Sequence, residues 1–264
     1  NATDKLLTTL PTDGYYATLA QDLWMDAVNN SPAGSHRMVF ENNLGDILDK
    51  DVAATDHVVG ISVGPNNHGA TNVVAGSAPL IKPGTEWYDF YYEHLGAQTS
   101  QKYRVYLDRR VRDIEYHILF LDRMGSWGSF AFTGRYYEKG NVTREQFNRD
   151  VQGYVQGGSP FNHWSYNTQD KGYVNSYIST DTTIDLNTNW MTEEMAQYFS
   201  ELISSPETYI KKAIYDDEDC EQPQSTEYIS CNILTSSYEL FKKRNKNLIR
   251  QSITIKYANN DLVN

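Results

Sequence analysis

Apolar residues occur in short alternating runs along most of the chain, a pattern that predicts β-strands rather than long helices. The clearest run is residues 114–121, where Ile114, Tyr116, Ile118 and Phe120 share one face of an extended chain. Apolar residues reach the other face near the end of this run, so we expect the strand to be largely buried. Further strands are predicted at residues 57–63, 87–92, 103–107, 129–137, 228–234, 238–241 and 248–257, with a pair of strands at 173–186.

Two segments show helical spacing instead. Three apolar residues of the segment 15–28 fall on one helix face, which predicts a helix there. The second predicted helix is 192–204, because Thr192 can cap its first turn, two glutamates follow, and Pro206 stops the pattern. Its apolar face should pack on a sheet.

Turn-forming residues divide the chain unevenly. Residues 1–82 are acidic and interrupted by Gly and Pro, so we predict an irregular, loop-rich N-terminal region, with a loop at 64–76. Strand signals dominate residues 84–264, which we predict to form one β-rich domain. The fold class expected is mainly β, an antiparallel β-sandwich-like body with one or two packed helices.

Glycine marks the turn between the strands at 114–121 and 129–137, which should form a hairpin. Gly125 and Gly128 flank Trp127 and would let the backbone turn with positive φ while the indole folds over the hairpin; the interpretation that we favour is a simple hairpin turn.

Charge and composition exclude some classes of protein. The 264 residues carry 23 Lys and Arg against 34 Asp and Glu, a net charge of -11 that disfavours nucleic acid as a partner. No apolar run is long enough to span a membrane, and the first residues lack the order of a signal peptide. The 20 tyrosines are unusual, because such rings favour strands and interfaces.

No motif for catalysis or for a cofactor is present. The six histidines form no helical pair, and the acidic run 216–221 lacks the alternation and the glycine of a calcium loop. Nucleophile elbows, phosphate-binding loops and dinucleotide motifs are absent as well. We therefore predict no catalytic residue, no cofactor and no metal, and we expect Cys220 and Cys231 to be free thiols.

Paired aromatic residues allow two interpretations. Tyr15 and Tyr16, Tyr91 and Tyr92, Tyr136 and Tyr137, and Trp164 with Tyr166 could stack on sugars. The interpretation that we favour places one ring of each pair in the core and the other in a subunit contact, because neighbouring residues of a strand face opposite ways.

Basic residues gather near the C-terminus of this acidic chain. We predict that they contact an acidic face of a neighbouring copy rather than DNA. The candidate subunit contact consists of Lys242, Lys243, Arg244, Lys246 and Arg250.

Four segments between about residues 87 and 257 occur in a characteristic order: 120–135 (FLDRMGSWGSFAFTGR), 142–145 (VTRE), 190–210 (WMTEEMAQYFSELISSPETYI) and 236–243 (SSYELFKK). This order resembles that of virion structural proteins of tailed phages and prophages of the Bacteroidetes group. This resemblance implies a non-enzymatic, multi-copy component of the tail, neck or baseplate with a mainly β body, located in the virion after assembly in the host cytoplasm. Its partners would be copies of itself and other tail or neck proteins.

The function expected is therefore a structural subunit that assembles into a ring through subunit contacts. The alternative is a carbohydrate-binding or host-receptor-recognising β module, for which exposed paired aromatics would be the sign. A third hypothesis is a glycan hydrolase, which would require a cleft with convergent carboxylates.

Overall fold

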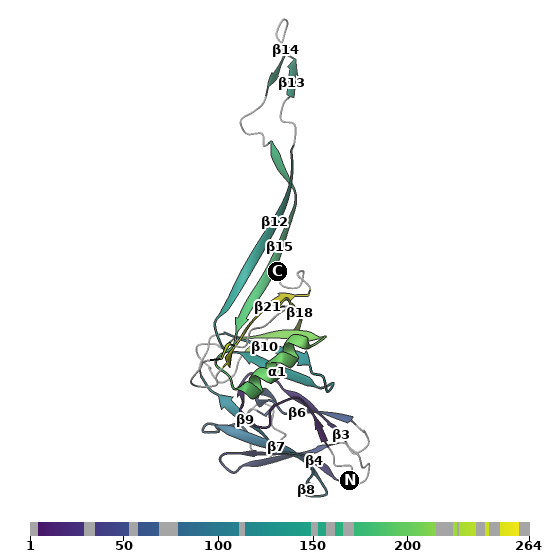
Figure 1. The fold of residues 1–264 in the computed structure, drawn as a ribbon, viewed down its shortest axis with the longest axis vertical. Coiled ribbons are helices and arrows are strands. Elements are labelled where there is room, and N and C mark those ends of the chain that lie inside the picture. Colours follow the sequence, from purple (N-terminus) through teal and green to yellow (C-terminus); the bar gives the residue numbers. More distant parts are fainter. Residues whose placement is uncertain are drawn as a thin grey trace.

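β-Strands predominate in the structure, a computed structural model, and a single α-helix, α1 (Glu193–Ser204), occurs in the part that it describes (Figure 1). This confirms the predicted mainly β, sandwich-like fold. No helix of the described part is long and apolar enough to cross a membrane. The described residues are 5–28, 35–52, 58–68, 79–110, 114–148, 153–156, 162–165, 172–214, 224–225, 227–235, 241–242 and 249–258.

The lower part of the molecule in Figure 1 contains two sheets. One is six-stranded and antiparallel except for the parallel pair β2–β9. Its order is β2 (Tyr15–Thr18), β9 (Tyr103–Asp108), β7 (Trp87–His94), β4 (His36–Asn42) and β5 (Ile47–Val52), with β8 (Ala97–Gln98) on β7. The other has the order β1 (Lys5–Leu7), β3 (Trp24–Val28) and β6 (Val58–Ser62).

These sheets correct two expectations. The segment 15–28 is not a helix but two strands, because Tyr15 is buried while Tyr16 is 57% exposed, a two-residue period that helical spacing concealed. The described part of residues 1–82 is built from strands rather than being irregular. Since β2 pairs with β9 and β4 with β7, the predicted boundary between residues 82 and 84 falls inside a sheet.

A third sheet, of eight strands, forms the upper part of the body. Its order is β11 (Trp127–Phe132), β10 (Ile114–Leu121), β16 (Thr208–Ile214), β18 (Ile229–Ile233), β21 (Ser252–Tyr257), β15 (Tyr173–Asn187) and β12 (Tyr136–Asn148), with β17 (Gln224–Ser225) on β16. The predicted hairpin between β10 and β11 is confirmed, but residues 136 and 137 belong to the next strand. The predicted strand pair at 173–186 is one continuous strand.

Three short elements complete the structure. They are the 3₁₀ helix η1 (Pro65–His68), the hairpin β13 (Gly153–Gln156) with β14 (Asn162–Ser165), and the hairpin β19 (Phe241–Lys242) with β20 (Ile249–Arg250). η1 begins the segment predicted as a loop at 64–76, whose remainder from residue 69 lies outside the described residues.

Helix α1 begins and packs as its sequence predicts. The Thr192 hydroxyl accepts a hydrogen bond from the backbone N–H of Met195 at 3.4 Å. The Phe199 ring lies 5.3 Å from that of Phe130 and 6.1 Å from that of Phe132, centroid to centroid, so the helix packs on β11.

The two glycines of the β10–β11 hairpin have different roles. Gly125 has a φ of +87°, as expected, but Gly128 does not have a positive φ. A Cβ on Gly128 would lie 2.5 Å from the Tyr198 hydroxyl and 2.8 Å from the Phe120 ring. Gly128 therefore provides space for α1 rather than turn geometry.

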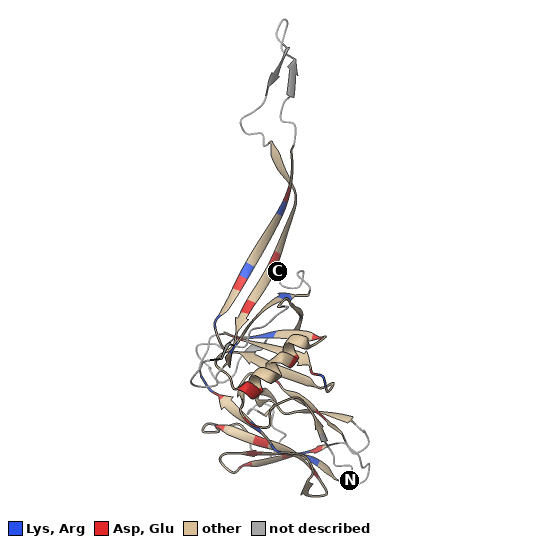
Figure 2. Cartoon of the chain, viewed as in Figure 1, with Lys and Arg blue, Asp and Glu red and all other residues tan. Residues whose placement is uncertain are grey.

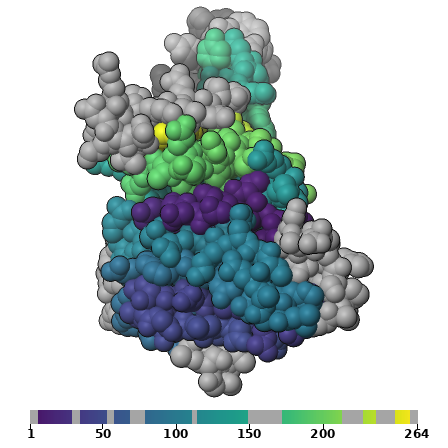
Figure 3. All heavy atoms as spheres, turned by 60° about the horizontal axis from the view of Figure 1, so that its bottom comes forward, coloured from purple at the N-terminus to yellow at the C-terminus, as the bar shows by residue number. Residues whose placement is uncertain are grey.

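A buried polar interface joins the N-terminal segment to the eight-stranded sheet. The Lys211 Nζ of β16 lies 2.7 Å from Oδ2 of Asp22, and Tyr228 and Asn66 donate hydrogen bonds to the same carboxylate. Nearby, His117 of β10 contacts the Thr18 hydroxyl at 3.0 Å. Figure 3 shows the N-terminal segment, in purple, crossing the body between the blue strands below and the green helix above.

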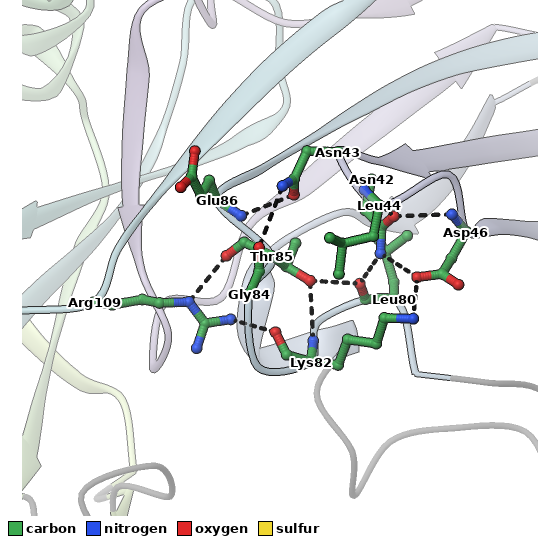
Figure 4. A network of polar contacts seen from close by, with 10 residues as sticks. All are labelled: Asn42, Asn43, Leu44, Asp46, Leu80, Lys82, Gly84, Thr85, Glu86 and Arg109. Atoms are coloured by element: carbon green, nitrogen blue, oxygen red, sulfur yellow. Dashed lines mark hydrogen bonds and ion pairs between the residues drawn. The ribbon is translucent and has the colours of Figure 1, made fainter.

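A second polar network fixes the turn between β4 and β5 (Figure 4). The amide of buried Asn42 accepts hydrogen bonds from the backbone N–H groups of Leu44 and Asp46 and donates to the carbonyl of Leu80 and the Asp46 carboxylate. Asp46 also pairs with Lys82 at 2.6 Å. The segment before β7 is thereby attached to the β4–β5 turn, which lies beside the start of β7, where Asn42 is opposite Tyr88.

The buried ion pair gives a first prediction. Lys211→Met should lower the free energy of unfolding by about 3 kcal/mol or more, because it leaves the buried Asp22 carboxylate without its cation. Urea unfolding followed by circular dichroism measures this loss. The double variant Asp22→Asn with Lys211→Met should lose less than the sum of the two single variants; additive losses would contradict the coupling.

Buried His68 gives a second prediction. Its ring is 2% exposed, and burial, with the charge of Lys50 adding to it, lowers the His68 pKa to about 3. The unfolded chain therefore gains a proton below about pH 6.5 that the folded chain does not take, so stability falls as the pH falls. Between pH 7 and pH 4 the free energy of unfolding should therefore fall by about 3 kcal/mol less in His68→Leu than in the wild-type protein. The measurement is urea unfolding at a series of pH values. The same pH dependence of the free energy of unfolding in the wild-type protein and in His68→Leu would contradict the prediction.

Candidate functional site

Strands β12 and β15, at the edge of the eight-stranded sheet, continue beyond the body as a two-stranded arm (Figure 1). They pair from Tyr136 opposite Leu186 to Asn148 opposite Tyr173, and all 13 residues of β12 are exposed. At about 3.3 Å per residue the arm reaches roughly 40 Å. Among the described residues no strand pairs with the outer edge of β12, which ends its sheet.

The base of β15 anchors the arm in the body. Ile184 and Leu186 are buried, and they lie opposite Ile255 and Ile253 of β21. Only residues 183–187 of β15 make this contact, so the rest of the strand is paired on one side alone. The β-branched residues of the strand favour the extended backbone that the arm needs.

One face of the arm continues the apolar row of the core. Side chains two residues apart share a face, so Ile178 of β15 lies on the same face as Ile184. Val142 of β12, opposite Thr180, belongs to this face too. Val142 is 44% and Ile178 53% exposed, because the body does not extend far enough to cover them. The same face also carries Glu138, opposite Ile184, and Arg144, opposite Ile178. We call the part of it formed by Val142 and Ile178 the apolar face of the arm.

The opposite, polar face carries charged residues that pair with one another. Figure 2 shows where acidic and basic residues occur along the two strands. Lys139 contacts Asp185 across the two strands, and the hydrogen bond from Lys139 lowers the pKa of this carboxyl. Farther out, Lys256 of β21 reaches Asp181 at 2.8 Å. These pairs compensate much of the charge at the base of the arm internally.

A β-bulge interrupts the arm near its outer end. The register shifts between Glu145 and Gln146, and the Ser176 hydroxyl donates to the Glu145 carbonyl at 3.1 Å. Bulges increase the local twist of a ribbon, so the outer part is turned relative to the base.

A pocket of about 640 Å³ lies at the foot of the arm. Met191 and Ile249 form a β-bridge, which places Trp190 directly opposite Arg250 on the outward side. Other lining residues come from the segment that leads into β12 and from the residue before Trp190; they include Thr133, Arg135, Tyr137 and Asn189. The described lining residues include two arginines and no carboxylate.

The predicted basic contact is only partly described. Arg250 is exposed at the end of β20, and Lys242 lies in β19, where it pairs with Ile249. Lys243, Arg244 and Lys246 lie outside the described residues, as do Cys220 and the acidic run 216–221. Trp190 and Asn189 are not among the residues predicted from the sequence. A tryptophan two residues before the predicted helix cap Thr192 is the sequence signal that points to this position.

The other candidate residues have the following outcomes. Cys231 is a buried free thiol, as predicted, and burial raises its pKa to about 11. The described His, Cys, Asp and Glu side chains form no group of three that could hold a metal ion. Tyr15 and Tyr16 separate into a buried and an exposed ring as predicted, whereas Tyr136 and Tyr137 are both exposed. Trp164 lies in β14, and Tyr166 lies outside the described residues.

Comparison of the chain with models of known protein families gives no match, and comparison with curated proteins gives none either.

Proposed function

We propose that this protein is a non-enzymatic structural subunit of a multi-copy assembly and that its arm makes the principal contact between copies. The observation that carries the proposal is the exposure of the arm on both faces and along the edge of β12. A two-stranded hairpin is marginally stable in water by itself, and it gains stability when further strands or a packed surface join it.

The edge and the apolar face of the arm both support a protein partner. An unpaired strand edge offers a row of backbone N–H and C=O groups that another chain can pair with. Val142 and Ile178 add apolar area that a partner would remove from water. Because the arm and the body are different surfaces, an arm-to-body contact is heterologous, and such a contact forms a ring when the rotation between neighbouring copies closes.

The resemblance to virion structural proteins of tailed phages supplies the setting of the proposal. The assembly would be a ring of the tail, neck or baseplate, built with other tail or neck proteins. The basic residues from Lys242 to Arg250 are proposed as charged contacts at its rim, where they would influence orientation more than affinity.

Shortening the arm tests this function. Lys139 lies opposite Thr183, so replacing residues 140–182 by Asn-Gly leaves a two-residue hairpin and the buried base intact. The full-length chain should form oligomers whose mass rises with concentration in light scattering, with rings in electron micrographs. The shortened chain should stay monomeric with its body folded. A full-length chain that remains monomeric at hundreds of micromolar would contradict the proposal.

Two matched variants locate the contact on the arm. Val142→Lys with Ile178→Lys adds two charges to the apolar face and should weaken assembly by at least about tenfold, because each lysine must be desolvated in the contact. Thr143→Lys with Ser179→Lys adds the same charge to the polar face at neighbouring positions and should change assembly much less. Equal effects of the two variants would exclude the apolar face as the contact.

A further inference from the structure

We propose that the pocket at the foot of the arm binds an acidic saccharide, a sugar that carries a carboxylate. The pocket lies at the base of the arm rather than along its exposed length, and of the basic residues proposed as rim contacts of the assembly only Arg250 is among its described lining residues. A volume of about 640 Å³ is in the range of pockets that bind small organic ligands.

The charge of the pocket points to an anionic ligand. Arg135 and Arg250 both line it, and neither has an ion-pair partner among the described residues. In a chain with a net charge of -11, two such arginines in one hollow are unusual. A guanidinium group presents a planar fork of donors that matches a carboxylate in a bidentate pair.

The aromatic rings point to a ligand larger than a simple ion. Trp190 is 45% and Tyr137 53% exposed, and both rings line the pocket. Exposed rings of this kind offer flat apolar surfaces with a polar edge, which suit the C–H face and the hydroxyl groups of a pyranose. Trp190 lies opposite Arg250 in the β-bridge register, so a stacking surface and a cation stand side by side.

The walls of the pocket are fixed before any ligand binds. The N–H of Gly134 donates to the Asn187 carbonyl at 3.0 Å, and a Cβ at Gly134 would lie 2.4 Å from that oxygen. The Asn187 amide also donates to the Arg135 carbonyl at 2.7 Å. This close approach holds the segment that carries Arg135 against the end of β15, which reduces the ordering cost of binding.

Polar groups between the rings supply partners for sugar hydroxyls. The Asn189 amide nitrogen donates to the Thr133 hydroxyl at 2.7 Å, which fixes the orientation of this amide, and both residues line the pocket. The combination of two cations, two rings and an oriented amide is what separates this pocket from a plain anion site.

Calorimetric titration with defined saccharides tests the proposal. Trigalacturonate should bind at least about tenfold more tightly than neutral maltotriose, which corresponds to 1.4 kcal/mol or more for the charged contacts. The double variant Arg135→Gln with Arg250→Gln should remove the preference for trigalacturonate over maltotriose. Trp190→Ala should weaken the binding of both saccharides. Arg123→Gln is the matched control, since it removes one exposed arginine outside the pocket, and it should change affinity by less than about twofold.

Several outcomes would overturn the assignment. They are the absence of saturable trigalacturonate binding, equal affinity for maltotriose, unchanged binding by the double arginine variant, or inorganic phosphate competing as strongly as the trisaccharide. The chain with the shortened arm retains every described lining residue and should bind like the full-length chain. Loss of trigalacturonate binding by the chain with the shortened arm would also overturn the proposed saccharide site. Whether that chain is monomeric tests only the proposed assembly.

Discussion

The buried contact between Asp22 and Lys211 is the constraint on which the arrangement of the two halves depends. It joins the turn after β2 to the central strand β16, and both side chains are almost fully removed from water. A buried ion pair adds little net stability compared with apolar packing. A buried charge without its partner, however, strongly lowers the free energy of unfolding. The contact therefore specifies one docking geometry between the sheets more than it strengthens the fold.

The geometry of this interface determines where the arm stands. α1 packs on β10 and β11, and the N-terminal segment contacts β10 and β16, so the eight-stranded sheet has a fixed base. Its far edge leaves the body through β15 and β12. Because Ile184 and Leu186 are locked in the core, the arm is a continuation of a rigid sheet rather than a tethered loop.

The two proposed roles use different parts of this edge. Assembly would use the exposed length of the arm, where backbone groups and Val142 and Ile178 are uncovered. Saccharide binding would use the foot, where Arg250 and Trp190 meet across a β-bridge. Both depend on the body remaining folded, and Arg250 is the one described residue that the two proposals share.

The sequence by itself determined the elements whose signals are local. The cap at Thr192, the apolar spacing of α1 and the alternation in β10 predicted those elements correctly, because capping and periodicity act within a few residues. Tertiary structure decided the rest. Residues 15–28 became strands because sheet pairing outweighed a weak helical pattern, and residues 173–187 became one strand because β12 lies beside its whole length. The pocket brings residues 133–137, 189–190 and 250 together across more than a hundred positions of chain, which no local pattern specifies.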